Sequence, residues 1–139
     1  MGKSQISDSV IKTSGAIIKN GNGDFLLQLR GFDAPTYPDK WIIFGGHCEG
    51  GETPVETVVR EIFEELGINF KKERFSYAGD FYFNNESGEK NVTFLFRLSI
   101  EPEEKIILGE GVDFGFFKKE EIKNLPVPPW MGEIVEKYF

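Results

Sequence analysis

A chain of 139 residues, 40% of them hydrophobic, has the size and composition of one folded domain with a substantial core. Its formal net charge of -7 argues against a nucleic-acid polymer as partner, because proteins that bind one present a basic surface to the phosphates. A small anionic ligand would instead need metal ions, held by carboxylates, to offset the negative charge.

The single cysteine, Cys48, permits no disulfide bond within the chain and gives no sign of an oxidising compartment. No apolar run approaches the roughly 20 residues of a membrane-spanning helix, and residues 1–10 lack the apolar core of a signal peptide. We therefore expect a cytoplasmic protein with no membrane partner. Residues 1–139 should form one domain, with residues 1–9 as a flexible terminus.

The first part of the chain predicts a β-hairpin and then a short buried strand. Residues 11–18 form a segment rich in β-branched residues, Asn-Gly-Asn-Gly at 20–23 indicates a turn, and a second apolar run covers 25–30. The prolines within residues 31–40 indicate a loop. The apolar run 41–44 then predicts a strand that ends at a pair of glycines and leads into a glycine-rich turn.

A helix is predicted over residues 54–66 by signals at both of its ends. Thr53 is a suitable N-cap, Pro54 fits the first helical position, and Glu56 completes a Thr-x-x-Glu capping box. Gly67 suits the left-handed conformation that commonly ends a helix. At about 100° per residue, the apolar side chains gather on one face, which we expect to pack against the core.

Three glutamates of this helix lie on another face. Glu61, Glu64 and Glu65 have i, i+3 and i+4 spacing, so their carboxylates project together. Three anions this close repel one another unless a cation lies between them. Magnesium takes oxygen ligands and keeps several waters, so a few converging carboxylates suit it. The pattern therefore predicts a divalent-cation site.

The second part of the chain predicts a further hairpin, then short strands and helices. The expected strands are residues 75–83, 92–100, 105–108 and 112–117, and the expected helices are residues 119–125 and 130–138. The order of strands and helices indicates the α/β (α+β) class, with a mixed β-sheet between layers of helix.

Residues 46–68 resemble the Nudix box, the signature of the Nudix hydrolases. Gly46 is followed after five residues by Glu52, and after seven more by Arg60-Glu61-Ile62-x-Glu64-Glu65-x-Gly67-Ile68. The resemblance extends to the strand before the box and to the aromatic strand after Glu110, so it covers most of the chain. The sequence departs from the usual pattern at Phe44 and Gly50, where the family commonly has proline.

The resemblance implies a Nudix fold, an α/β/α sandwich around a mixed β-sheet. It also implies a MutT-like pyrophosphohydrolase that uses magnesium (Mg2+) or manganese (Mn2+). In such an enzyme, Glu61, Glu64 and Glu65 would bind metal together with the backbone carbonyl of Gly46. One metal would bridge pyrophosphate oxygens, and another would lower the pKa of the attacking water.

The same resemblance gives roles to other residues. Arg60 resembles the arginine that orients the glutamates, and Glu52 resembles the residue that supports the junction of loop and helix through Arg60. The general base would be a carboxylate. Two candidates for the base stay open: Glu61 inside the box, and Glu110 on the loop Gly109-Glu110-Gly111. If Glu110 is not the base, it is an ordinary loop glutamate.

Contacts with the substrate are expected outside the acidic helix as well. Arg30 follows a strand and is a candidate phosphate contact, the alternative being a surface arginine. Gly45, Gly46 and His47 are further candidates. His47 is the only histidine, which argues against multi-histidine metal chemistry and against a Ser-His-Asp triad. The loops at residues 33–37 and 81–90 are expected to carry specificity.

We expect a small-molecule nucleotide substrate, either a (deoxy)nucleoside triphosphate, including oxidised forms, or a nucleotide sugar. ADP-ribose and dinucleoside polyphosphates rank lower because no further motif indicates them, and capped RNA ranks last because the chain is acidic. The alternative of another class is a non-catalytic nucleotide-binding sensor. A sensor would be expected to lack box glutamates or Arg60, and all are present. The protein would be a monomer or a homodimer, with Trp130 available for an interface.

Overall fold

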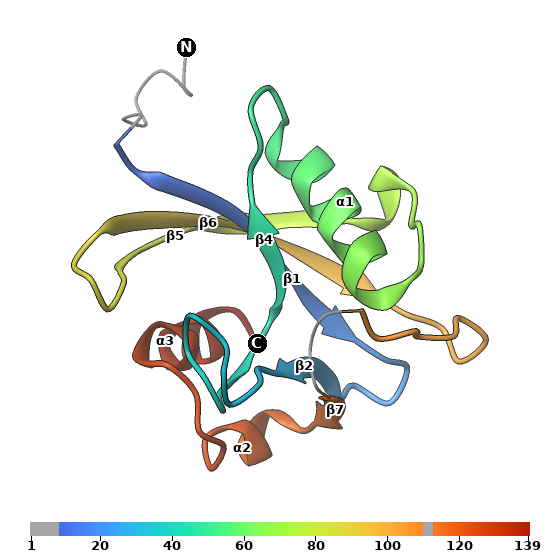
Figure 1. Cartoon of the computed structure of the whole chain (residues 1–139). Helices are drawn as coiled ribbons and strands as arrows, with labels where there is room; N and C mark the ends of the chain where they lie inside the picture. Colours follow the sequence, from blue (N-terminus) through green and yellow to red (C-terminus); the bar gives the residue numbers. More distant parts are fainter. Residues whose placement is uncertain (1–8, 110–112) are drawn as a thin grey trace.

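The structure is a computed structural model in which residues 9–109 and 113–139 are described (Figure 1). The strands are β1 (Ile11–Lys19), β2 (Phe25–Leu29), β3 (Trp41–Ile42), β4 (Phe44–His47), β5 (Ser76–Asn84), β6 (Lys90–Ser99) and β7 (Asp113–Phe117). The helices are α1 (Pro54–Leu66), the 3-10 helix η2 (Lys72–Arg74), α2 (Lys119–Ile122) and α3 (Pro129–Tyr138).

Strand β1 runs through the centre of the sheet. It pairs in parallel with β6, from Ile11 opposite Asn91 to Lys19 opposite Ser99. Its other edge is shared by two antiparallel partners, β4 along residues 13–16 and β2 along residues 18–19. β2 also pairs with β3 and β7, and β6 pairs with β5. The predicted mixed sheet and both predicted hairpins are therefore confirmed.

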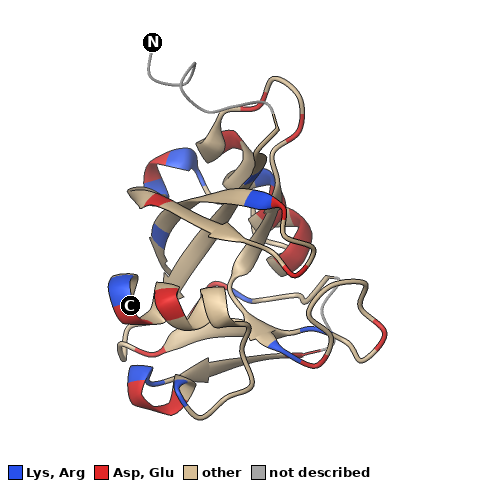
Figure 2. Cartoon of the chain, turned by 90° about the vertical axis from the view of Figure 1, so that its left-hand side faces the viewer, with Lys and Arg blue, Asp and Glu red and all other residues tan. Residues whose placement is uncertain are grey.

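Side chains of β1 alternate between two hydrophobic clusters on opposite faces of the sheet, because successive residues of a strand point in opposite directions. The cluster under α1 includes Ala16, Ile18, Phe44, Val58, Ile62 and Leu66. The cluster under α2 and α3 includes Ile17, Leu27, Leu95, Ile122, Met131 and Ile134. Helices thus cover both faces (Figure 1), and the predicted sandwich is confirmed. Charged residues lie mainly on the loops and helices (Figure 2).

Helix α1 has the limits that its capping signals predict. The Thr53 hydroxyl accepts the Glu56 N–H at 3.3 Å, and the Glu56 carboxylate accepts the Thr53 N–H at 2.9 Å. Gly67 ends the helix with φ 76°, a left-handed conformation that glycine adopts without strain. Both ends of α1 are therefore determined by local sequence.

The predicted strand at residues 105–108 is wrong. The segment runs past the C-terminal end of α1, where Ile107 N–H donates to the Leu66 carbonyl and Gly109 N–H donates to the Glu65 carbonyl, both at 2.8 Å. The last carbonyls of a helix have no partner within the helix. The segment provides those partners, so its N–H groups are engaged away from the sheet.

The predicted strand at residues 41–44 divides into two. β3 follows the edge of β2, whereas β4 follows the edge of β1 and extends to His47. The pair Gly45 and Gly46 therefore lies in a strand rather than in a turn. The strand predicted at residues 112–117 is confirmed from Asp113 onward, and the helix predicted at residues 119–125 is shorter, ending at Ile122.

Two predictions about the whole chain are not tested by the described residues. The terminus predicted to be flexible, residues 1–9, falls outside the described residues except for Ser9. The assignment of one domain to residues 1–139 stays a prediction. Among the described residues, no helix has the length and apolar character needed to cross a membrane.

The capping box of α1 leads to a first prediction. In Thr53→Ala the N-terminal N–H groups of α1 lose a side-chain acceptor, so we expect the free energy of unfolding to fall by about 1 kcal/mol. Thr53→Ser retains a hydroxyl at the cap and should stay close to the wild type. Urea unfolding followed by circular dichroism measures both. Equal midpoints for the two variants would show that the cap contributes nothing.

Candidate active site

The backbone of β4 lies directly against two carboxylates of α1. Gly45 N–H donates to Oε1 of Glu65 at 3.0 Å, and the Glu65 side chain is buried. A Cβ atom on Gly46 would overlap the carboxyl group of Glu61, so only glycine permits this approach. A Cβ atom on Gly45 would overlap the Ser14 carbonyl oxygen of β1. The two glycines therefore let the strand lie between β1 and the glutamates.

Arg60 joins the loop, the helix and the end of β4. Its Nε and Nη2 atoms donate to the two carboxylate oxygens of Glu52, at 2.6 and 3.0 Å. Nη1 donates to Glu61 at 2.8 Å, and Nη2 also donates to the His47 carbonyl at 3.0 Å. Both oxygens of Glu64 lie 3.4 Å from Nη1. One guanidinium thus orients three carboxylates and the backbone of β4.

Glu52 accepts hydrogen bonds from other groups besides Arg60. It also accepts the Glu49 N–H at 3.0 Å and the Thr57 hydroxyl at 2.8 Å. Hydrogen bonding from Arg60, followed by that from Glu49 and Thr57, lowers the pKa of Glu52 to about 2. The same interaction with Glu52 raises the pKa of Arg60. The pair stays charged throughout the neutral range, and the loop is fixed to the helix.

The glutamates that the sequence predicts as metal ligands take two different positions. Glu61 and Glu65 adjoin β4, whereas Glu64 is half-exposed and lies beside Arg60. Over residues 9–109 and 113–139, no three His, Cys, Asp or Glu side chains are arranged to hold a metal ion together. Magnesium commonly uses only one or two carboxylates, with waters and substrate phosphates completing its shell. Glu61 and Glu65, with a carbonyl of β4, fit that requirement.

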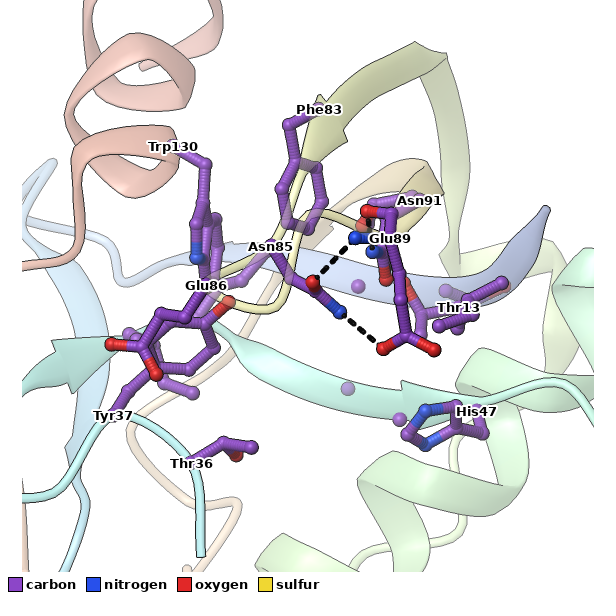
Figure 3. A pocket seen from close by; sticks show the side chains of 18 of the residues that line it. Thr13, Thr36, Tyr37, His47, Phe83, Asn85, Glu86, Glu89, Asn91 and Trp130 are labelled. Carbon is purple, nitrogen blue, oxygen red and sulfur yellow. Dashed lines mark hydrogen bonds between the residues drawn. The ribbon is translucent and has the colours of Figure 1, made fainter.

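A cavity of about 340 Å³ opens beside β4 (Figure 3). Gly45, Gly46, His47 and Arg30 all line it, so the structure brings together the four residues predicted to contact the substrate. Arg30 donates from Nε to the Thr36 carbonyl at 3.0 Å and from Nη2 to the Thr36 hydroxyl at 3.1 Å. The volume is at the lower end of small-molecule sites.

Both loops predicted to carry specificity contribute to the cavity. Tyr37 of the first loop lies edge-on to Trp130 of α3, with ring centroids 5.4 Å apart. Phe83 of the second segment stacks on Trp130 at 5.1 Å. Burial raises the pKa of Tyr37, the Trp130 indole N–H lowers it in part, and the charge of Glu86 raises it. These side chains form an aromatic wall at the end away from His47 (Figure 3).

Sequence reasoning missed the part that Trp130 plays in this wall. The sequence indicates Trp130 only as a residue available for an interface; in the structure it lines the cavity, because α3 packs beside β5. Asn91 and Thr93 of β6 also line the cavity and belong to no recognised motif. Nothing in the local sequence distinguishes them from other strand residues. Glu110, the second candidate for the general base, lies outside the described residues.

Comparisons with known proteins agree with this geometry. Residues 11–138 match the family model of the NUDIX domain. Diphosphoinositol polyphosphate phosphohydrolase 3-beta of Bos taurus is 39% identical over 64 residues, which are 46% of this chain and 37% of that protein. Nucleoside triphosphatase NudI of Enterobacter sp. (strain 638) is 47% identical over 51 residues, 37% of this chain and 36% of that protein. The chain therefore matches little more than a third of the length of these curated relatives.

Solved structures resemble the protein over nearly its whole length. The MutT protein from Methanosarcina mazei Go1 has a TM-score of 0.81 and 25% identity, covering 96% of this chain and 95% of that one. A C. elegans Ap4A hydrolase has a TM-score of 0.74 and 21% identity, covering 93% and 95%, and at that identity it shows the fold alone. Since the family model spans all but the ends of the sequence, the chain belongs to the Nudix hydrolase family.

Proposed function

We propose that this protein is a metal-dependent Nudix hydrolase that cleaves a phosphoanhydride bond in a nucleoside diphosphate derivative. The observation that carries the proposal is the contact between β4 and α1: the Gly45–Gly46 backbone lies against Glu61 and Glu65 at the edge of a cavity. Carboxylates beside a backbone carbonyl provide the oxygen donors that a hard divalent cation requires.

Glu61, Glu65 and the Gly46 carbonyl would hold Mg2+, or Mn2+ in its place, with Glu64 as a further carboxylate nearby. A bound metal ion would neutralise negative charge on the pyrophosphate and would lower the pKa of a coordinated water. Arg60 keeps Glu61 in position, and Glu52 keeps Arg60 in position. The proton of the attacking water would pass to a carboxylate, either Glu61 or Glu110.

Arg30 would contact the phosphates of the substrate, and His47 also lines the cavity. A guanidinium has five N–H donors, and only two of those of Arg30 are used by Thr36. Its remaining donors suit an anion, which the planar fork of arginine binds well.

A nucleoside triphosphate, including oxidised forms, or a nucleotide sugar is the substrate we favour. The name of the NudI relative also indicates nucleoside triphosphates, whereas that of the bovine relative indicates a phosphorylated inositol. We rank ADP-ribose and dinucleoside polyphosphates lower as substrates. The alternative from a different functional class is a non-catalytic nucleotide sensor. We propose a cytoplasmic monomer or homodimer that requires no nucleic acid or membrane.

Turnover of a nucleotide panel in the presence of Mg2+ tests the function. We expect release of phosphate or pyrophosphate from at least one nucleotide. In Glu65→Gln, kcat/KM should fall at least about 100-fold, with weaker binding of Mg2+, because a metal ligand loses its charge. Mass spectrometry of the products identifies the substrate and the bond cleaved. Tight binding of one nucleotide without turnover of any would favour the sensor instead.

The close approach of Gly46 to Glu61 gives a further prediction. In Gly46→Ala the new methyl group displaces the Glu61 carboxylate, so activity should fall at least about 100-fold, as small misplacements at reacting centres do. Gly50→Ala is a matched control, because a Cβ atom there meets no atom within 4 Å and activity should persist. Steady-state kinetics compares them. Full activity in Gly46→Ala would show that this contact is dispensable.

The depressed pKa of Glu52 predicts how stability depends on pH. The ordinary value is 4.5 and the folded value is about 2, so the folded state favours the carboxylate. The resulting stabilisation is present above pH 4.5 and is lost as the pH falls toward 2. The stability difference between wild type and Glu52→Gln should therefore shrink across that interval. Urea unfolding at several pH values measures it, and a constant difference would contradict the assigned interaction.

A further inference from the structure

Uncharged polar side chains of the sheet line the cavity between β4 and the aromatic wall. Strand register places His47 of β4 beside Thr13 of β1, and Thr13 beside Thr93 of β6. Asn91, two residues before Thr93, lies beside Phe83 of the aromatic wall. Figure 3 shows Asn91 between Phe83 and Thr13 in this view. Thr13, Asn91 and Thr93 all line the cavity, so this part of the lining suits a neutral polar group.

Asn91 is a buried amide whose oxygen has no partner among the described residues. The residue is only 7% exposed, and its Nδ2 donates to the Glu89 carbonyl at 3.0 Å, which orients the amide. Oδ1 of Asn91 accepts no hydrogen bond from the described part of the chain. A buried acceptor is costly when no partner reaches it. Because Asn91 lines the cavity, a ligand that supplies a donor is favoured there.

The hydroxyl of Thr93 provides a second acceptor. Thr93 and Asn91 are two residues apart on β6, so their side chains point to the same face of the sheet. The hydroxyl oxygens of Thr13 and Thr93 lie 2.8 Å apart, and the Thr13 hydroxyl donates to the Val92 carbonyl at 3.4 Å. Each hydroxyl has one proton, so Thr93 donates to Thr13 and keeps its own lone pairs for a ligand.

The sugar of a nucleotide fits this position. With the pyrophosphate at β4 and the flat base against the rings of the aromatic wall, the sugar that joins them lies over β1 and β6. Its hydroxyl groups are neutral donors. The 2′-hydroxyl is the one nearer the base, and Asn91 is the polar residue beside Phe83. The 3′-hydroxyl lies nearer the 5′-phosphates, as Thr93 lies nearer β4 through Thr13.

We infer that the proposed hydrolase selects ribonucleotides over 2′-deoxyribonucleotides, and that Asn91 makes this selection by accepting a hydrogen bond from the 2′-hydroxyl. The inference rests on the proposed function. Thr93 accepts from the 3′-hydroxyl, which both kinds of nucleotide have. A deoxyribonucleotide leaves Oδ1 of Asn91 unpaired beneath the sugar and shuts water away from it, and this produces discrimination.

Four pairs of nucleotides that differ only at the 2′ position test the selection: ATP, CTP, GTP and UTP, each beside its 2′-deoxy form. In the pair that is hydrolysed fastest, kcat/KM should be at least about tenfold higher for the ribonucleotide. In Asn91→Leu the ratio should fall to within about threefold, because leucine has a similar shape and no acceptor. Equal kcat/KM values within every pair, or an unchanged ratio in Asn91→Leu, would overturn the inference.

Two further variants serve as matched controls. Asn91→Asp, like Asn91→Leu, loses the N–H that binds the Glu89 carbonyl, but it keeps an acceptor and should retain the preference for ribonucleotides. Thr93→Val should lower kcat/KM for both members of a pair by a similar factor and leave their ratio unchanged. Loss of the preference in Asn91→Asp or in Thr93→Val, with Asn91→Leu unaffected, would contradict the assignment to Asn91.

Binding of the monophosphates AMP, CMP, GMP and UMP and their 2′-deoxy forms, measured by calorimetry, separates this inference from the proposed function. We expect at least one ribonucleotide to bind about tenfold more tightly than its deoxy partner, and this difference to disappear in Asn91→Leu. That preference without turnover of any triphosphate would count against the hydrolase alone. Equal affinities within all four pairs, including affinities too weak to measure, would overturn the selection by Asn91, whatever the turnover.

Discussion

The candidate site depends on the position of one planar cation. The Arg60 guanidinium binds Glu52 of the loop before α1 through two parallel hydrogen bonds, and it binds Glu61 on the helix. It also holds the last carbonyl of β4. A lysine would bring a point charge without this fork and could not fix three segments at once. The loop, the helix and the strand keep one relative geometry because they share this group.

Negative charge has one effect beside β4 and another along the rest of the cavity lining. At the β4 end, Glu61 and Glu65 attract a cation, and the cation makes the end suitable for pyrophosphate. The rest of the described lining carries the carboxylates of Glu86 and Glu89, and Arg30 is its one Lys or Arg. The acidic composition of the chain thus fits an anionic substrate only if its phosphates face the metal and the remainder is neutral.

Local sequence determines α1 and leaves the cavity wall undetermined. Thr53, Glu56 and Gly67 act on backbone groups a few residues away, so the limits of α1 could be predicted. Residues 105–108 have a strand-like composition, but their N–H groups meet the end of α1, a contact that no nearby residue indicates. Trp130 joins Phe83 only because α3 packs beside β5. The motif contains the glutamates and Arg60, whereas the residues of the aromatic wall are brought together only by tertiary packing.

The shared edge of β1 affects which parts of the sequence can diverge without disturbing the candidate site. β4 occupies residues 13–16 of that edge and β2 occupies residues 18–19, so the sheet forks beside Ile17. One branch carries the strand that meets α1, and the other carries β3 and β7. Substitutions in the second branch or in its loops can reshape the cavity while the pairing of β4 with β1 persists. The reactive geometry and the choice of substrate can therefore diverge independently within a single sheet.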